Sequence, residues 1–123
     1  MMIPFLVSKI HRAKVTSTDL EYYGSISIDE EIMKEANLRE YQKVEIYDIT
    51  NGSRLNTYVI PAPAGSRDII LNGAAAHLVN TGDIIIIAAY ALIDERELDT
   101  RNSVVLLMND TDNSIDKVIN GKL

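Results

Sequence analysis

The sequence predicts a mainly β protein, a small β-barrel with a few short helices. Three observations predict it: many short runs of β-forming residues, turn signals between these runs, and only brief stretches with helical spacing. Asn51-Gly52 gives the strongest turn signal, because both residues tolerate positive φ and two β-rich runs flank them. Many short strands with few helices favour a barrel over a parallel α/β sheet.

The first predicted elements are a strand and the helix that follows it. Ile26 and Ile28 alternate with polar residues, which is the period of a half-buried strand. Asp29 can cap a helix whose first turn holds two glutamates, and these suit the positive end of the helix dipole. Asn37 can end this helix, because asparagine tolerates the left-handed conformation.

The rest of the chain alternates between strands and turns. Strands are expected at residues 43–49, 54–60, 68–71, 84–89 and 103–108. Short helices are expected at 74–79 and 94–99, and Asn72-Gly73 is a second turn candidate. Residues 109–116 are polar, so we expect a loop there and a C-terminal tail that frays.

Composition narrows the class of protein. The 123 residues suit a single domain, and a net charge of -6 argues against nucleic acid as a partner. The chain has no cysteine and only two histidines, far apart, which argues against a metal site. The longest apolar run, Ile84 to Ile93, is too short to span a bilayer. Residues 1–7 lack the basic region of a signal peptide, so we expect no membrane association and a cytoplasmic location.

One segment carries most of the chemical information, Leu20-Glu21-Tyr22-Tyr23-Gly24-Ser25-Ile26-Ser27-Ile28-Asp29. The Gly24-Ser25 pair alone would be only a turn glycine and an exposed strand serine. Three further segments accompany it: Lys9-Ile10-His11-Arg12, Arg54-Leu55-Asn56-Thr57-Tyr58 and Asn72-Gly73-Ala74-Ala75-Ala76. Together the four segments resemble the aspartate 1-decarboxylase family, in register from about Leu6 to Ala89. Beyond Ala89 the match fades.

The resemblance implies a double-psi β-barrel, a homotetramer and a pyruvoyl cofactor made from the chain itself. It implies cleavage between Gly24 and Ser25 into a β chain, 1–24, and an α chain, 25–123, which begins with the pyruvoyl group. The implied activity is α-decarboxylation of L-aspartate to β-alanine and carbon dioxide, for pantothenate and hence coenzyme A biosynthesis. Spontaneous cleavage and cleavage aided by a maturation factor both stay open.

The residues suit this chemistry. Removing an α-carboxyl group leaves a carbanion, which needs an electron sink that ordinary side chains do not offer. A pyruvoyl carbonyl is such a sink once the substrate amine forms a Schiff base with it. Attack of the Ser25 hydroxyl on the Gly24 carbonyl, elimination and hydrolysis would build this group. Glycine at position 24 has no Cβ to block the attack and can adopt conformations forbidden to other residues.

The resemblance also assigns roles on and beside one strand. Tyr58 matches the proton donor, and Thr57 matches a hydroxyl that assists cleavage and lies near the substrate. Because neighbours on a regular strand face opposite sides, both can serve one site only where the strand twists or lies at a boundary. His11 and Tyr22 are expected to aid maturation.

Substrate binding is assigned to a turn and two cations. Asn72 begins the turn, whose small residues let main-chain donors approach a carboxylate; they are Gly73, Ala74 and Ala75. Lys9 and Arg54 are expected to hold the carboxylates of aspartate, in an order that stays open.

Two other functions stay open. A barrel could keep Gly24-Ser25 as a turn and act as a binding module. A pyruvoyl enzyme could also act on glutamate instead of aspartate. A pyridoxal enzyme is disfavoured, because the chain shows no recognisable phosphate site.

Overall fold

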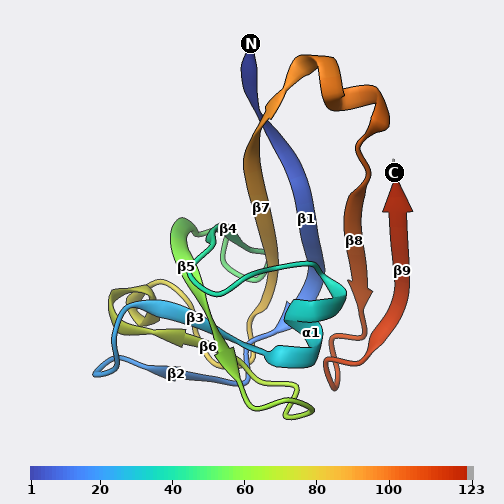
Figure 1. The fold of residues 1–123 in the computed structure, drawn as a ribbon. Helices are drawn as coiled ribbons and strands as arrows, with labels where there is room; N and C mark the ends of the chain where they lie inside the picture. The colour runs from blue at the N-terminus through green and yellow to red at the C-terminus, as the bar shows by residue number, and fades with distance from the viewer. Residues whose placement is uncertain (122–123) are drawn as a thin grey trace.

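A computed structural model describes residues 1–121, so the last two residues of the expected α chain lie outside the described part. The strands are β1 (Met2–Lys14), β2 (Ser17–Asp19), β3 (Ser25–Asp29), β4 (Lys43–Asp48), β5 (Arg54–Ala62), β6 (Ile69–Asn72), β7 (Ile84–Asp94), β8 (Ser103–Met108) and β9 (Ile115–Gly121). The helices are α1 (Glu30–Glu35) and two 3₁₀ turns, η1 (Gly73–His77) and η2 (Glu95–Thr100). Figure 1 shows their arrangement.

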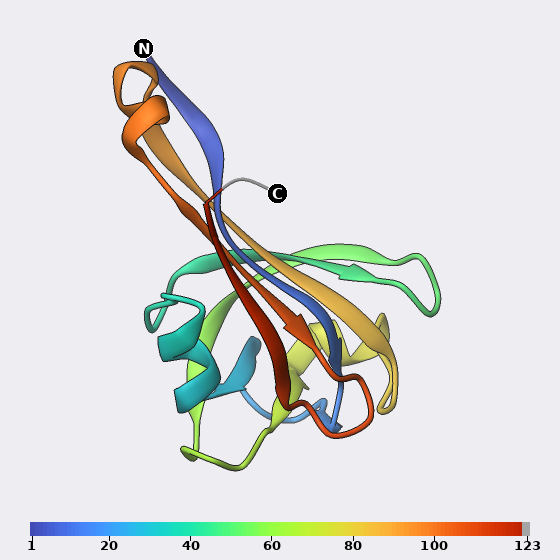
Figure 2. The ribbon, with the colours of Figure 1, turned by 90° about the vertical axis from the view of Figure 1, so that its right-hand side faces the viewer.

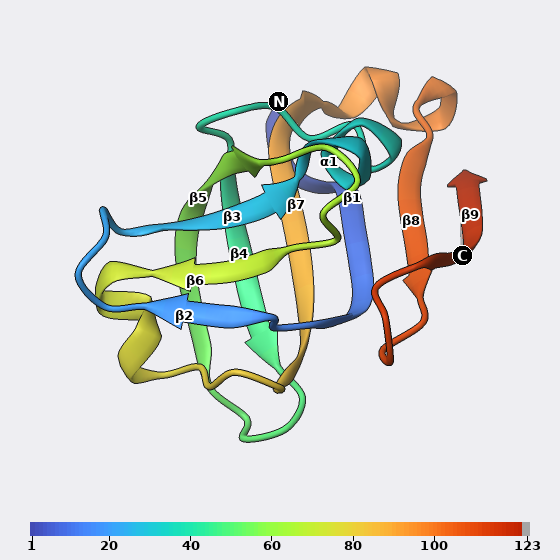
Figure 3. The same ribbon diagram turned by 90° about the horizontal axis from the view of Figure 1, so that it is seen from below.

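All the strands belong to one sheet, in the order β2-β6-β3-β5-β4-β7-β1-β8-β9. The sheet curls, and β3, β6 and β2 run across β5, β4 and β7 (Figure 3). The prediction of a small, mainly β barrel with few short helices is confirmed. The double-psi topology stays a prediction.

The two strongest local signals give the predicted structures. Asp29 accepts a hydrogen bond from the backbone nitrogen of Glu31 at 2.8 Å, which caps α1. Asn37 follows α1 with a φ of 56°, so it ends the helix in the left-handed region. The turn at Asn51-Gly52, with a φ of 81° at Gly52, joins β4 and β5 as an antiparallel hairpin. Short-range chemistry therefore determines these elements.

The longest strand is β1, which lies between β7 and β8. It pairs antiparallel with β7 along its whole length and parallel with β8 from Ser8 to His11. The start of β1, the end of β7 and η2 form an arm that rises from the barrel (Figure 2). The arm carries exposed apolar side chains: Met1, Met2, Tyr90 and Leu92.

The C-terminal segment is tied to the barrel. Residues 109–114 form the expected loop, but β9 follows, so the prediction of a frayed tail is wrong for residues 115–121. Asn113 is buried, and its side chain accepts from Lys14 N at 2.7 Å and donates to Lys14 O at 2.8 Å. It also donates to Arg67 O at 3.0 Å. These bonds hold the β8–β9 loop against β1.

The core lies inside the curled sheet and is almost entirely aliphatic. Its largest fully buried side chains are Ile10, Ile26, Ile28, Ile46, Ile69, Leu71, Ile85, Ile87 and Leu106. They come from β1, β3, β4, β6, β7 and β8, so apolar burial joins segments that are far apart in the sequence. Within residues 1–121, the short helices include none that is long and apolar enough to cross a membrane.

Candidate active site

Ser25 begins β3 and is buried, although it follows an exposed loop. It is 1% exposed, whereas Tyr23 is 81% exposed. The pairing explains the burial, because β3 lies between β5 and β6 and Ser25 stands opposite Asn72. The Ser25 hydroxyl donates to the carbonyl oxygen of Tyr23 at 2.9 Å. A serine hydroxyl is therefore held away from bulk water beside the Gly24–Ser25 peptide bond.

Two glycines, Gly24 and Gly73, are in contact at this point. Only Gly73 has a backbone conformation that favours glycine. Gly73 has a φ of 68°, and a Cβ there would lie 2.7 Å from Gly24 Cα and 2.8 Å from Gly24 N. Gly24 itself does not have positive φ, and a Cβ on it would meet nothing within 4 Å. The forbidden conformation expected at Gly24 is therefore absent there and occurs at Gly73. Glycine at 73 lets the loop that carries Gly24 close against η1.

Asn72 connects two serines of β3. Its side-chain nitrogen lies 3.0 Å from Ser25 Oγ and 2.9 Å from Ser27 Oγ. All three residues are buried. Asn72 was expected in a substrate-holding turn, whereas Ser27 was not among the expected site residues. The sequence feature that could have identified Ser27 is its position two residues after Ser25, which puts both serines on one face of a strand.

A cleft of about 620 Å³ opens beside the Gly24–Ser25 bond. Its lining comes from the loop before β3, from the β4–β5 hairpin, from the end of β6, and from η1 with the residue after it: Gly24, Lys43, Leu55, Asn56, Thr57, Tyr58, Asn72, Ala74, Ala75 and Leu78. The structure thus brings together the predicted cleavage point, the predicted proton donor and the predicted substrate turn.

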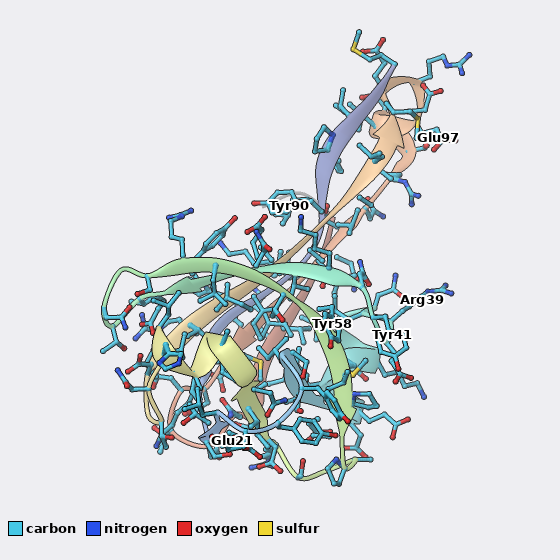
Figure 4. All side chains as sticks on the ribbon, turned by 90° about the vertical axis from the view of Figure 1, so that its left-hand side faces the viewer. Glu21, Arg39, Tyr41, Tyr58, Tyr90 and Glu97 are labelled. Atoms are coloured by element: carbon cyan, nitrogen blue, oxygen red, sulfur yellow. The ribbon has the colours of Figure 1, made fainter. Side chains whose placement is uncertain are left out.

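Thr57 and Tyr58 both line the cleft although they are neighbours on β5. Tyr58 is the last β5 residue that pairs with β4, opposite Lys43, and Val59 is the first that pairs with β3. This change of pairing partner is a boundary of the kind at which both side chains can face one site. Thr57 is half-buried, and Tyr58 is 37% exposed with its ring 5.9 Å from that of Tyr41 (Figure 4).

The predicted substrate cations lie on the outer face of the β1-β7-β4-β5 part of the sheet. Register aligns two rows of residues across these strands, Lys9-Ala88-Glu45-Asn56 and His11-Ile86-Tyr47-Arg54. The Arg54 guanidinium lies 4.0 Å from the centre of the Tyr47 ring. Lys9 and Arg54 are three strand spacings apart across the sheet, roughly 14 Å, and they also lie in different rows along the strands. Neither cation lines the described cleft. Asn56, which stands in the same row as Lys9, does line it.

The two residues expected to aid maturation are also apart. His11 lies in the outer row, and its Nδ1 is buried without a hydrogen-bond partner among residues 1–121. Burial, and then the charges of Lys9 and Arg12, lower the pKa of His11, which favours a neutral ring. Tyr22 lies on the cleft side, where its carbonyl oxygen would be 3.1 Å from a Cβ at Gly73.

Lys43 lines the cleft and was missed by the sequence analysis. It stands opposite Tyr58, so counting the hairpin register back from Asn51-Gly52 would have placed it there. Its side chain adds positive charge to the cleft. Among residues 1–121, no group of three His, Cys, Asp or Glu side chains is arranged to hold a metal ion.

Comparisons with known proteins give one family. A family model described as Aspartate decarboxylase matches residues 1–116. The chain is 52% identical over 119 residues to the aspartate 1-decarboxylase of Sulfurimonas denitrificans, covering 97% of this chain and 98% of that relative. Over 113 residues it is 52% identical to the enzyme of that name from Aliarcobacter butzleri, covering 92% and 89% of the two chains. Over 110 residues it is 54% identical to that of Wolinella succinogenes, covering 89% and 91%. The similarity therefore extends well past Ala89.

Proposed function

This chain belongs to the aspartate decarboxylase family, and from that membership we propose that it converts L-aspartate to β-alanine and carbon dioxide with a pyruvoyl group derived from Ser25. The observation that carries the proposal is the Gly24–Ser25 bond at a cleft, in a chain that matches the family over residues 1–116. The β-alanine would supply pantothenate and hence coenzyme A biosynthesis.

Self-cleavage begins with the Ser25 hydroxyl. Its Oγ bonds to the Gly24 carbonyl carbon, the C–N bond breaks, and the amide nitrogen takes the hydroxyl proton. The ester then eliminates across Cα and Cβ of residue 25, which frees the Gly24 carboxylate. Hydrolysis of the resulting dehydroalanine releases ammonia and leaves the pyruvoyl group. Thr57 lines the cleft, and its proposed role is to donate a hydrogen bond to the oxyanion of the first step.

The residues around Ser25 fit a carbonyl group at this position. An N–H of Asn72 faces the Ser25 side chain at 3.0 Å and is a donor for a carbonyl oxygen. The pyruvoyl carbonyl, conjugated to the next amide, supplies the electron sink for the carbanion. Tyr58, on the cleft wall, donates the proton that completes β-alanine.

A second copy of the chain would complete the substrate site. Lys9 and Arg54 lie on the outer face, outside the cleft of their own chain. In the homotetramer that the family implies, the outer face of one copy would lie against the cleft of another and bring these cations to the substrate carboxylates. Lys43 would add charge from within the cleft. The exposed apolar side chains of the arm support such an assembly, because burying them against another copy would be favourable.

Intact-mass analysis of the purified protein tests the proposal. We expect fragments 1–24 and 25–123, the larger one blocked at its N-terminus, and β-alanine formation from aspartate. Ser25→Ala should abolish both, because no hydroxyl remains to attack. If the chain stays at full length after mild heating, with and without cell extract that could supply a maturation factor, the protein is a binding module instead. If the cleaved protein decarboxylates glutamate but not aspartate, the proposed substrate is wrong.

A further inference from the structure

Ser27 is buried, carries no role in the chemistry above, and contacts the residue that holds Ser25. It is 8% exposed and lies two residues after Ser25 on β3. Its Oγ lies 2.9 Å from the side-chain nitrogen of Asn72, and the same nitrogen lies 3.0 Å from Ser25 Oγ. One amide group therefore bridges the two serines.

The hydrogen bond of Ser25 determines which way the Asn72 amide points. The Ser25 hydroxyl lies 2.9 Å from the carbonyl oxygen of Tyr23, and a carbonyl can only accept. The single hydroxyl hydrogen of Ser25 is thus used, so Ser25 Oγ must accept from Asn72. The amide nitrogen has two hydrogens, and Ser27 Oγ takes the second.

We infer that Ser27 is a positioning residue for self-cleavage: it holds the Asn72 amide in the orientation in which that amide donates to the Ser25 hydroxyl. Without Ser27, one N–H of a buried amide would lack its acceptor, and the amide could rotate toward other partners. Ser25 would then lose the donor that restrains its Oγ. The inference rests on the proposed self-cleavage and adds a residue to it.

Cleavage gives Ser27 a second task. Once the hydroxyl of residue 25 is lost, Asn72 keeps only Ser27 of its two serine partners. Its other N–H is released toward the position of the former Ser25 side chain. Ser27 therefore keeps Asn72 in place in the cut protein as well.

Three variants separate the effect of the Ser27 hydroxyl from the effect of side-chain volume. Ser27→Ala and Ser27→Val lack the hydroxyl, whereas Ser27→Thr keeps it and has the volume of valine. The rate of appearance of fragment 1–24 is followed by intact mass in freshly purified protein. We expect about tenfold slower cleavage in the alanine and valine variants and a rate near wild type in the threonine variant.

Ser8→Ala is the matched control. Ser8 is as buried as Ser25, and its hydroxyl donates to Ala36 O at 2.6 Å, far from the cleavage point in the sheet. It should lose stability but cleave at the wild-type rate. Wild-type cleavage in Ser27→Ala, or equal slowing in the threonine and valine variants, would overturn the inference.

The side-chain amide resonances of Asn72 give a readout that a purely structural role would not move. In uncleavable Ser25→Ala protein, only Ser27 of the two serine partners remains, and we expect slow solvent exchange of the Asn72 amide hydrogens. Ser25→Ala with Ser27→Ala should exchange at least tenfold faster. Unchanged exchange would show that Ser27 does not hold the amide. If wild-type protein never cleaves, the proposed function fails, whereas wild-type cleavage with an indifferent Ser27→Ala rejects only this inference.

Discussion

Gly73 approaches Gly24 more closely than any side chain at position 73 would permit. We predict that Gly73→Ala lowers the free energy of unfolding by about 1–3 kcal/mol, because φ is positive there and the added Cβ would lie 2.7 Å from Gly24 Cα. Gly24→Ala should change it by less than about 0.5 kcal/mol, since open space surrounds that position. Urea unfolding of both variants in Ser25→Ala protein measures the difference without cleavage. Equal losses would contradict the assignment.

Thr57 and Tyr58 should separate the two reactions. We predict that Tyr58→Phe cleaves itself normally but decarboxylates aspartate roughly a hundredfold more slowly, because it lacks the proton donor. Thr57→Val should instead slow self-cleavage by about tenfold or more, because it removes a donor to the oxyanion. Self-cleavage is measured by intact mass. Decarboxylation is measured as β-alanine formed per pyruvoyl group. Tyr41→Phe is the control, since Tyr41 contacts Tyr58 but does not line the cleft. Exchanged phenotypes would reverse the two roles.

At the scale of elements, Asp48 at the end of β4 gives the hairpin a pH-dependent stability. Its Oδ1 accepts from the backbone of Thr50 and Asn51, while its buried Oδ2 has no hydrogen-bond donor among residues 1–121. Burial, and then the hydrogen bond and charge of Asp83, raise the pKa of Asp48 to about 6, against the lowering effect of the backbone N–H groups of Asn51 and Thr50. The added proton would lie between the two carboxyl groups.

A raised pKa in the folded state means that stability from this group is present below the unfolded pKa and is lost as pH rises through about 6. Asp48→Asn keeps an oxygen for the turn and cannot ionise. We predict that it is more stable than wild type by about 1–2 kcal/mol at pH 8, with the difference vanishing near pH 4. Chemical unfolding across this pH range measures it. If the difference in free energy of unfolding between the variant and wild type were the same at all pH values, the carboxyl pair would not be its cause.

The elements that local chemistry determines could be predicted, and those that depend on distant partners could not. The cap at Asp29 and the turn at Asn51-Gly52 involve residues a few positions apart, so composition and spacing identify them. The strand β9 has little apolar signal, and the loop before it is held by Asn113 through bonds to Lys14 and Arg67. Such long-range contacts leave no periodic pattern in the sequence.

The candidate site divides in the same way. The resemblance named Ser25, Thr57 and Tyr58, and the cleft brings the Gly24–Ser25 bond to the latter two. It could not place Ser27, whose role depends on the three-dimensional position of Asn72. It also named Lys9 and Arg54 without showing that neither lines the cleft, because sequence order does not give the positions of residues across the curled sheet.

At the scale of the whole molecule, the separation of Arg54 from the cleft predicts complementation between copies. Arg54→Leu should cleave itself but lose well over tenfold in kcat/KM for aspartate, because a desolvated carboxylate loses its partner. Ser25→Ala should be inactive through lack of the cofactor. Co-expressed, the two variants should recover activity, since an intact Ser25 from one copy meets an intact Arg54 from the other.

The measurement is β-alanine formation by the mixed protein, normalised to pyruvoyl content. Arg39→Leu is a suitable control, because this exposed arginine lies beside Tyr41 and lines no part of the cleft (Figure 4). If the mixture is no more active than Arg54→Leu alone, Arg54 serves the site of its own chain or no site at all.

The place of β1 in the sheet has a consequence for assembly. The strand belongs to residues 1–24, yet it lies between β7 and β8 and supplies Ile10 to the core. After the proposed cleavage it would remain bound only by these contacts. The precursor folds as one chain, at a rate independent of concentration. The cut protein, once unfolded, must reassemble from two different polypeptides, which makes its recovery slower on dilution. The precursor would fold and unfold reversibly, whereas the lifetime of the cut protein would be set by its rate of unfolding.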